Sequence, residues 1–109
     1  MEKIYNKLVR DRIPEIIISN GGEPITKILN DEEYKNELEK KLLEEYNEVL
    51  STKTKDERIE ELADMFEIIS SLSLVEGSSI DEVIEVARNK EIKRGGFNEK
   101  IYLEKVIEE

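Results

Sequence analysis

Two pairs of acidic residues in the middle of the chain have types and spacing that could bring four carboxylates together. The first pair is Glu45 and Glu48, and its members are three residues apart. The second pair, Glu61 and Asp64, has the same spacing. If both segments are helical, each pair lies on one side of its helix, one turn apart. A short polar spacer at 51–56 lets the two helices fold back antiparallel, so that the pairs face each other.

Four carboxylates that converge on one point repel strongly unless a cation lies between them. A cluster of oxygen ligands suits Mg²⁺ or Mn²⁺ and does not suit zinc. The alternative is a solvated acidic face, because Asp and Glu make up 27 of the 109 residues and such offsets recur by chance. The spacing by itself leaves both interpretations open.

The surroundings of the second pair favour a site. On a helical wheel, the segment 57–75 is apolar on two roughly opposite sides. One side contains Ile59, Leu62, Ala63, Phe66, Ile69 and Ser73, and the other contains Met65, Ile68, Leu72 and Val75. Glu61 and Asp64 continue the second side, so we expect them to be partly buried and to need a partner such as a metal ion. In the first pair, Glu45 flanks the apolar face of its helix and Glu48 lies further round toward solvent.

Helices are expected to carry these residues. A short helix begins near Pro14 and stops at the Ser-Asn-Gly-Gly stretch at 19–22. Caps and apolar periodicity predict three longer helices, over 31–50, 55–75 and 80–93. Asn30 or Asp31 caps the first of these, and Ser79 caps the last, with Glu82 placed as in a capping box.

The sequence defines the secondary structure of two other segments less clearly. Residues 25–29 alternate and contain β-branched side chains, which indicates a short strand. The tail at 101–106 is ambiguous between helix and strand, and pairing with 25–29 would form a two-stranded β ribbon. The expected fold is therefore mainly α: one domain over 1–109, built as an antiparallel helical bundle with or without this ribbon.

Basic residues gather at two places. Arg10 and Arg12 flank Asp11, and the triplet has two interpretations: surface salt bridging, or an arginine directed at a phosphate. The second group, at the end of the last predicted helix, comprises Asn89, Lys90, Lys93 and Arg94. Basic residues there are a normal helix ending, but they could also hold phosphate oxygens. Both interpretations stay open for each group.

Composition excludes several classes of function. The chain has no Cys and no His, which excludes disulfides, thiolate zinc sites, Cys or Ser–His nucleophile systems and imidazole acid–base chemistry. The formal net charge of −10 argues against a nucleic acid polymer or an anionic membrane as partner. A phosphorylated small molecule stays possible because a bound divalent metal reverses the local charge. No apolar run of membrane-spanning length and no signal peptide are visible, so we expect a cytoplasmic protein.

In the residues described above, the chain resembles the all-α nucleoside triphosphate pyrophosphohydrolase superfamily. This MazG-like group also holds phosphoribosyl-ATP pyrophosphohydrolase and dimeric dUTPases. Its hallmark, EExxE followed by a spacer and ExxD, is matched by Glu44-Glu45-Tyr46-Asn47-Glu48, twelve intervening residues, and Glu61-Leu62-Ala63-Asp64. KLVRDRIPEII at 7–17 and KEIKRGGF at 90–97 are similar to a small single-domain subgroup.

The resemblance implies Mg²⁺-dependent (or Mn²⁺-dependent) cleavage between the α- and β-phosphates of a nucleoside triphosphate, in nucleotide-pool house-cleaning. The implied metal ligands are Glu45, Glu48, Glu61 and Asp64. Glu44 would be a supporting or water-orienting carboxylate beside Glu45, and Asn89, Lys90, Lys93 and Arg94 would be candidates for contact with phosphates. It also implies a homodimer or homotetramer. The alternatives are a phosphoribosyl-ATP pyrophosphohydrolase and, in another class, a non-catalytic helical interaction module.

Overall fold

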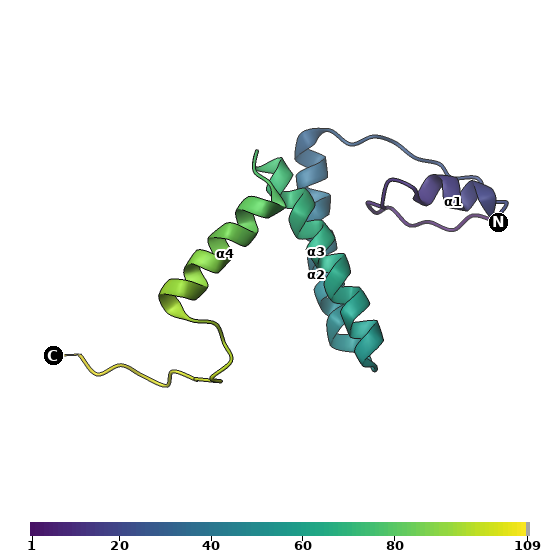
Figure 1. Ribbon diagram of the computed structural model, residues 1–109. Helices are drawn as coiled ribbons and strands as arrows, with labels where there is room; N and C mark the ends of the chain where they lie inside the picture. The colour runs from purple at the N-terminus through teal and green to yellow at the C-terminus, as the bar shows by residue number, and fades with distance from the viewer. Residues whose placement is uncertain (109) are drawn as a thin grey trace.

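The computed structural model describes residues 1–108, so Glu109, the last residue of the predicted domain, lies outside the described part. Within that range there are four helices, α1 (Ile13–Ser19), α2 (Asp31–Ser51), α3 (Lys55–Val75) and α4 (Ile80–Arg94) (Figure 1). The prediction of a mainly helical fold is confirmed, and the ends of the three longer helices lie within one residue of the predicted positions. None of these described helices is long and apolar enough to cross a lipid bilayer.

Local capping explains why the helices begin and end where they do. The Asn30 side chain accepts a hydrogen bond from the backbone N–H of Glu33, and the Glu33 carboxylate accepts one from the Asn30 N–H. This capping box satisfies two N–H groups that the first turn of α2 leaves free. Thr54 and Ser79 accept the equivalent bond from the third residue of α3 and α4. After α1, Gly21 has φ +87°, a conformation that favours glycine over residues with a Cβ.

Helices α2 and α3 lie side by side as an antiparallel hairpin, which positions the acidic residues (Figure 1). Its small core contains the buried side chains of Leu38, Val49 and Ile68. The connection is short, and the Val49 carbonyl at its start accepts hydrogen bonds from Thr52 Oγ1 at 2.7 Å and from Arg58 Nη1 at 3.1 Å. The Thr52 bond closes the end of α2, and the Arg58 bond ties that end to the first turn of α3.

The whole chain is elongated. Its Cα radius of gyration is 18.8 Å and its extents are 66 × 36 × 25 Å, whereas a compact chain of this length would have a radius of gyration of about 13 Å. Helix α4 contacts α3 and then runs away from the hairpin (Figure 1). Of the two apolar sides predicted for α3, the one with Ile68 packs against α2, while Ile59, Leu62 and Phe66 on the other stay about half exposed.

The β ribbon that the sequence left open, between residues 25–29 and 101–106, is absent from the described residues. Residues 1–108 contain no strand, and the two segments lie on opposite sides of the hairpin, one before α2 and one after α4 (Figure 1). Ile25 is 89% exposed and Ile101 is 80% exposed, so neither of these side chains packs against an apolar surface of the protein. A two-stranded ribbon is marginal without such a surface, and the tail accordingly forms neither helix nor strand.

Candidate metal centre

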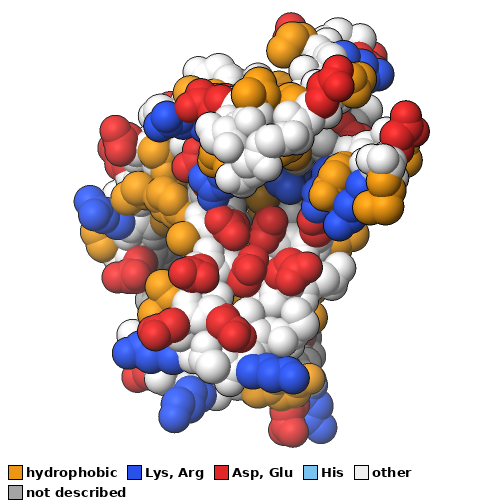
Figure 2. Space-filling model, turned by 90° about the vertical axis from the view of Figure 1, so that its right-hand side faces the viewer, with side chains coloured by type: hydrophobic (Ala, Val, Ile, Leu, Met, Phe, Trp, Pro, Cys, Tyr) orange, Lys and Arg blue, Asp and Glu red, His pale blue; other side chains and the backbone are white. Residues whose placement is uncertain are grey.

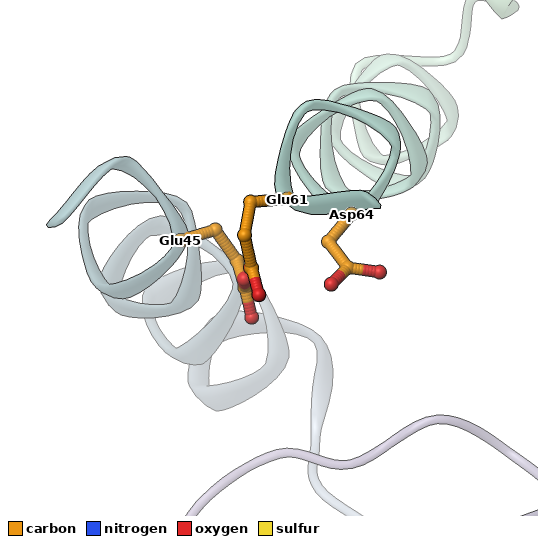
Figure 3. A group of neighbouring side chains, drawn as sticks. All are labelled: Glu45, Glu61 and Asp64. Carbon is orange, nitrogen blue, oxygen red and sulfur yellow. The ribbon is translucent and has the colours of Figure 1, made fainter. Parts of the chain in front are cut away.

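Three of the four predicted carboxylates come together across the hairpin. Glu45 extends from α2, and Glu61 and Asp64 extend from α3 (Figure 3). One oxygen from each lies within 4.8 Å of the others. The Glu45 and Glu61 carboxyl groups lie next to each other, and Asp64 points into the same region. Glu45 reaches this position because it lies four residues before the buried Val49, on the side of α2 that packs against α3.

All three residues are half-buried, and their surroundings penalise negative charge. Burial raises the pKa of Glu45 from 4.5 to about 7, and a hydrogen bond with Glu61 and the charge of Asp64 act in the same direction, against the opposing charge of Lys41. A hydrogen bond between two carboxyl groups requires a proton on one of them. Without that proton, Glu61 Oε2 is shielded from solvent and has no hydrogen-bond partner among the described residues. The group therefore holds a buried oxygen that a cation could satisfy.

The donor set fits a hard divalent cation. It offers carboxylate oxygens and no nitrogen or sulfur, which suits Mg²⁺ or Mn²⁺. Two oxygens on one Mg²⁺ are at most about 4.2 Å apart, twice the metal–oxygen distance. The separation of up to 4.8 Å thus needs only a small shift of the side chains. Mg²⁺ commonly takes a few protein carboxylates and completes its shell with water or phosphate oxygens, so three donors from one chain are sufficient.

The other two predicted acidic residues lie outside this group. Glu48 is exposed and does not belong to the group, because a step of three positions from Glu45 leaves its side chain rotated by about 60° round α2. Glu44 is half-buried, and its Oε1 accepts a hydrogen bond from Lys7 Nζ at 3.1 Å. On this face of the molecule, acidic side chains gather in the centre with basic side chains along their edge (Figure 2).

The segment that precedes α1 brings two basic side chains to the acidic residues of the hairpin. Arg10 Nη2 donates to Asp64 Oδ1 at 2.7 Å, so this predicted phosphate ligand is bound to a carboxylate here. Arg12, the other predicted arginine, pairs with Glu15 on α1 and is highly exposed. Sequence reasoning missed Lys7; the signal that could have found it is its place three residues before Arg10 in the same motif.

The second predicted basic group lies far along α4. Its members are exposed, and none of them takes part in an ion pair within residues 1–108; they are Asn89, Lys90, Lys93 and Arg94. They lie in the half of α4 that diverges from the hairpin (Figure 1). Within one chain, the structure does not bring this group to the carboxylates.

Comparisons with known proteins give a likeness but no function. No family model matches the chain. A curated but uncharacterised protein of Mycolicibacterium smegmatis is 44% identical over 54 residues, which are 50% of this chain and 55% of the relative. The chain thus spans about half the length of the curated relative it matches. No solved structure matches.

Proposed function

We propose that this protein is a Mg²⁺- or Mn²⁺-dependent nucleoside triphosphate pyrophosphohydrolase of the MazG-like superfamily. It would cleave between the α- and β-phosphates to give a nucleoside monophosphate and pyrophosphate. The observation that carries the proposal is the convergence of Glu45, Glu61 and Asp64 from two helices around a buried Glu61 oxygen that lacks a partner. These residues occupy three of the positions at which the superfamily motif has its metal ligands. The role in cytoplasmic house-cleaning stays a prediction.

The residues of this chain divide the proposed work between them. Glu45, Glu61 and Asp64 hold the cation, which neutralises phosphate charge and makes an attacking water more acidic when it is bound. Glu44 is next to Glu45 in the sequence and is the proposed acceptor of the proton from that water. Lys7 Nζ pairs with Glu44 Oε1 at 3.1 Å and so orients this carboxylate, whose other oxygen takes part in no ion pair within residues 1–108.

The proposed working unit is a homodimer or homotetramer. Its support is the uncovered apolar side of α3, where Ile59, Leu62 and Phe66 are about half exposed. An apolar row of this kind is costly to leave in water and usually marks an interface. In such an assembly, the basic end of α4 would be free to serve the carboxylate group of a neighbouring copy, which is the proposed role of Asn89–Arg94.

The test is a pyrophosphate-release assay over a panel of common and modified nucleoside triphosphates, with and without Mg²⁺ and Mn²⁺. We expect metal-dependent release from the wild type and none from Glu45→Gln or Asp64→Asn. Glu39→Gln is the matched control, because Glu39 is exposed on α2, outside the carboxylate group. The absence of release from every nucleotide with either metal would refute the proposal.

The same assay separates the alternatives. Turnover of phosphoribosyl-ATP, with none of the common or modified triphosphates, would favour the enzyme of histidine biosynthesis. A non-catalytic helical module predicts no hydrolysis, no dependence of stability on Mg²⁺, and only small effects of Glu45→Gln. The Glu61 oxygen without a partner favours the two metal-dependent enzymes over the interaction module. A buried acidic oxygen without a partner lowers stability, and a bound cation would compensate for that cost.

A further inference from the structure

The segment before α1 is attached to the hairpin by two ion pairs that reach both of its helices. Lys7 Nζ contacts Glu44 on α2 at 3.1 Å, and Arg10 Nη2 contacts Asp64 on α3 at 2.7 Å. Most of the segment's other side chains, Ile4 and Tyr5 among them, are exposed. Helix α1 itself packs against no other helix within residues 1–108. The attachment of this segment therefore depends strongly on the two ion pairs.

The Arg10 contact uses an oxygen of Asp64, one of the three residues of the proposed metal site. A guanidinium and a divalent cation cannot both sit against Asp64 at full strength, because they compete for the same charge. In the metal-free protein, Arg10 offsets part of the repulsion among the three carboxylates. A bound metal would take over that role and leave Arg10 without its partner.

Both basic side chains have the freedom to move. The Lys7 side chain is 43% exposed and that of Arg10 is 56% exposed, and neither has a second ion-pair partner among the described residues. Once released, they would stand at the edge of a metal site with two positive charges. The guanidinium fork and the ammonium group are the side chains that best match phosphate oxygens.

We propose that Lys7 and Arg10 are exchangeable counter-ions: they bind carboxylates in the metal-free protein and transfer to the phosphates of the ligand when metal binds. The proposal rests on the metal site proposed above and deepens it by assigning the phosphate contacts to this segment of the same chain. Arg12 differs from these two residues, because it pairs with Glu15 on α1 and makes no ion pair with the hairpin among the described residues.

The proposal predicts opposite effects of a single substitution on two affinities, that for the metal and that for a phosphate ligand. We expect Arg10→Gln to bind Mn²⁺ alone about two- to fivefold more tightly than the wild type, since a partly exposed ion pair no longer competes. The same variant, saturated with Mn²⁺, should bind inorganic pyrophosphate about tenfold more weakly, because a charge-assisted hydrogen bond is lost. Lys7→Gln should weaken pyrophosphate binding with a smaller effect on the metal, since Glu44 lies outside the three-carboxylate group.

Isothermal titration calorimetry on the full chain measures both affinities. The matched control is Lys3→Gln, which removes one positive charge from the same segment, where Lys3 lies over the Tyr5 ring at 5.2 Å. Limited trypsin digestion followed by mass spectrometry provides a readout independent of activity, because the Lys7 side chain is held in an ion pair while the segment is attached. Cleavage after Lys7 should accelerate when Mn²⁺ is added to the wild type, and should already be fast in metal-free Arg10→Gln.

The outcomes separate this inference from the function it rests on. If the wild type binds Mn²⁺ but Arg10→Gln binds it no more tightly, the counter-ion proposal is overturned and the metal site stands. If Arg10→Gln binds metal more tightly but pyrophosphate equally well, transfer to the phosphate is overturned. If neither protein binds Mn²⁺ although both keep their helical circular dichroism, both proposals fail. Arg10→Lys, which keeps the charge, should fall between the wild type and Arg10→Gln and guards against a folding defect.

Discussion

Replacing Glu45 by glutamine should stabilise the metal-free protein above pH 7. The pKa of Glu45 lies at about 7 in the folded chain, against an ordinary value of 4.5, so between these values the folded state binds more protons than the unfolded state. The contribution of Glu45 to the free energy of unfolding of the wild type is therefore highest below pH 4.5. This contribution falls as the pH rises to about 7. A neutral glutamine removes that loss, and its amide can donate to the buried Glu61 oxygen.

The magnitude follows from the shift and the exposure. Each pKa unit corresponds to about 1.4 kcal/mol, but solvent reaches the half-buried carboxyl group and screens it, which leaves about 1–2 kcal/mol. For a chain of this size, that corresponds to a rise in melting temperature of about 5–10 °C.

Thermal unfolding followed by circular dichroism in the presence of a chelator measures the effect across the pH range. The control is Glu39→Gln, an exposed change of the same charge on the same helix, which should follow the wild-type pH curve. Added Mg²⁺ should reverse the order, since it stabilises the wild type above pH 7 and has little effect on Glu45→Gln. Parallel pH curves for Glu45→Gln and the wild type, or a less stable variant at every pH, would refute the reasoning.

Three further predictions concern the fold and the assembly. Leu38→Ala should lower the free energy of unfolding by about 2–4 kcal/mol in urea titrations because Leu38 is 3% exposed, whereas Leu43→Ala, at a residue 61% exposed, should change it little in the monomer. Asn30→Ala should cost about 1 kcal/mol in the same titrations, because it removes the capping box of α2. Phe66→Asp should dissociate the proposed oligomer to single chains in native mass spectrometry while helical content is kept, and an unchanged mass would exclude this side of α3 as the interface.

The helices could be predicted because their signals are local. Asn30 and Ser79 begin helices through bonds to residues three positions away, and this needs no knowledge of the rest of the chain. The sequence could not decide whether the ribbon forms, because strand pairing is non-local. Neither the alternation at 25–29 nor the ambiguity at 101–106 contains information on whether the two segments meet.

The candidate site was predictable only in part, for a similar reason. The spacing of Glu61 and Asp64 and the short spacer before them are local features, and together they predict convergence with α2. Helical periodicity also indicated that Glu48 faces solvent, although the motif makes it a ligand. The pairing of Arg10 with Asp64 bridges 54 positions in the sequence, so no periodicity could reveal it. Repulsion among the three carboxylates alone would predict that Asp64→Asn stabilises the metal-free protein. The substitution also removes the ion pair with Arg10, which opposes that gain in stability.

The elongated shape affects how the size of the protein must be measured. A particle of 66 × 36 × 25 Å diffuses more slowly than a compact protein of equal mass. A gel-filtration column calibrated with globular standards would therefore assign it too large a mass, and a single chain could be mistaken for a dimer. Sedimentation equilibrium does not depend on shape, and it is therefore the appropriate method for testing whether copies of the chain assemble through α3.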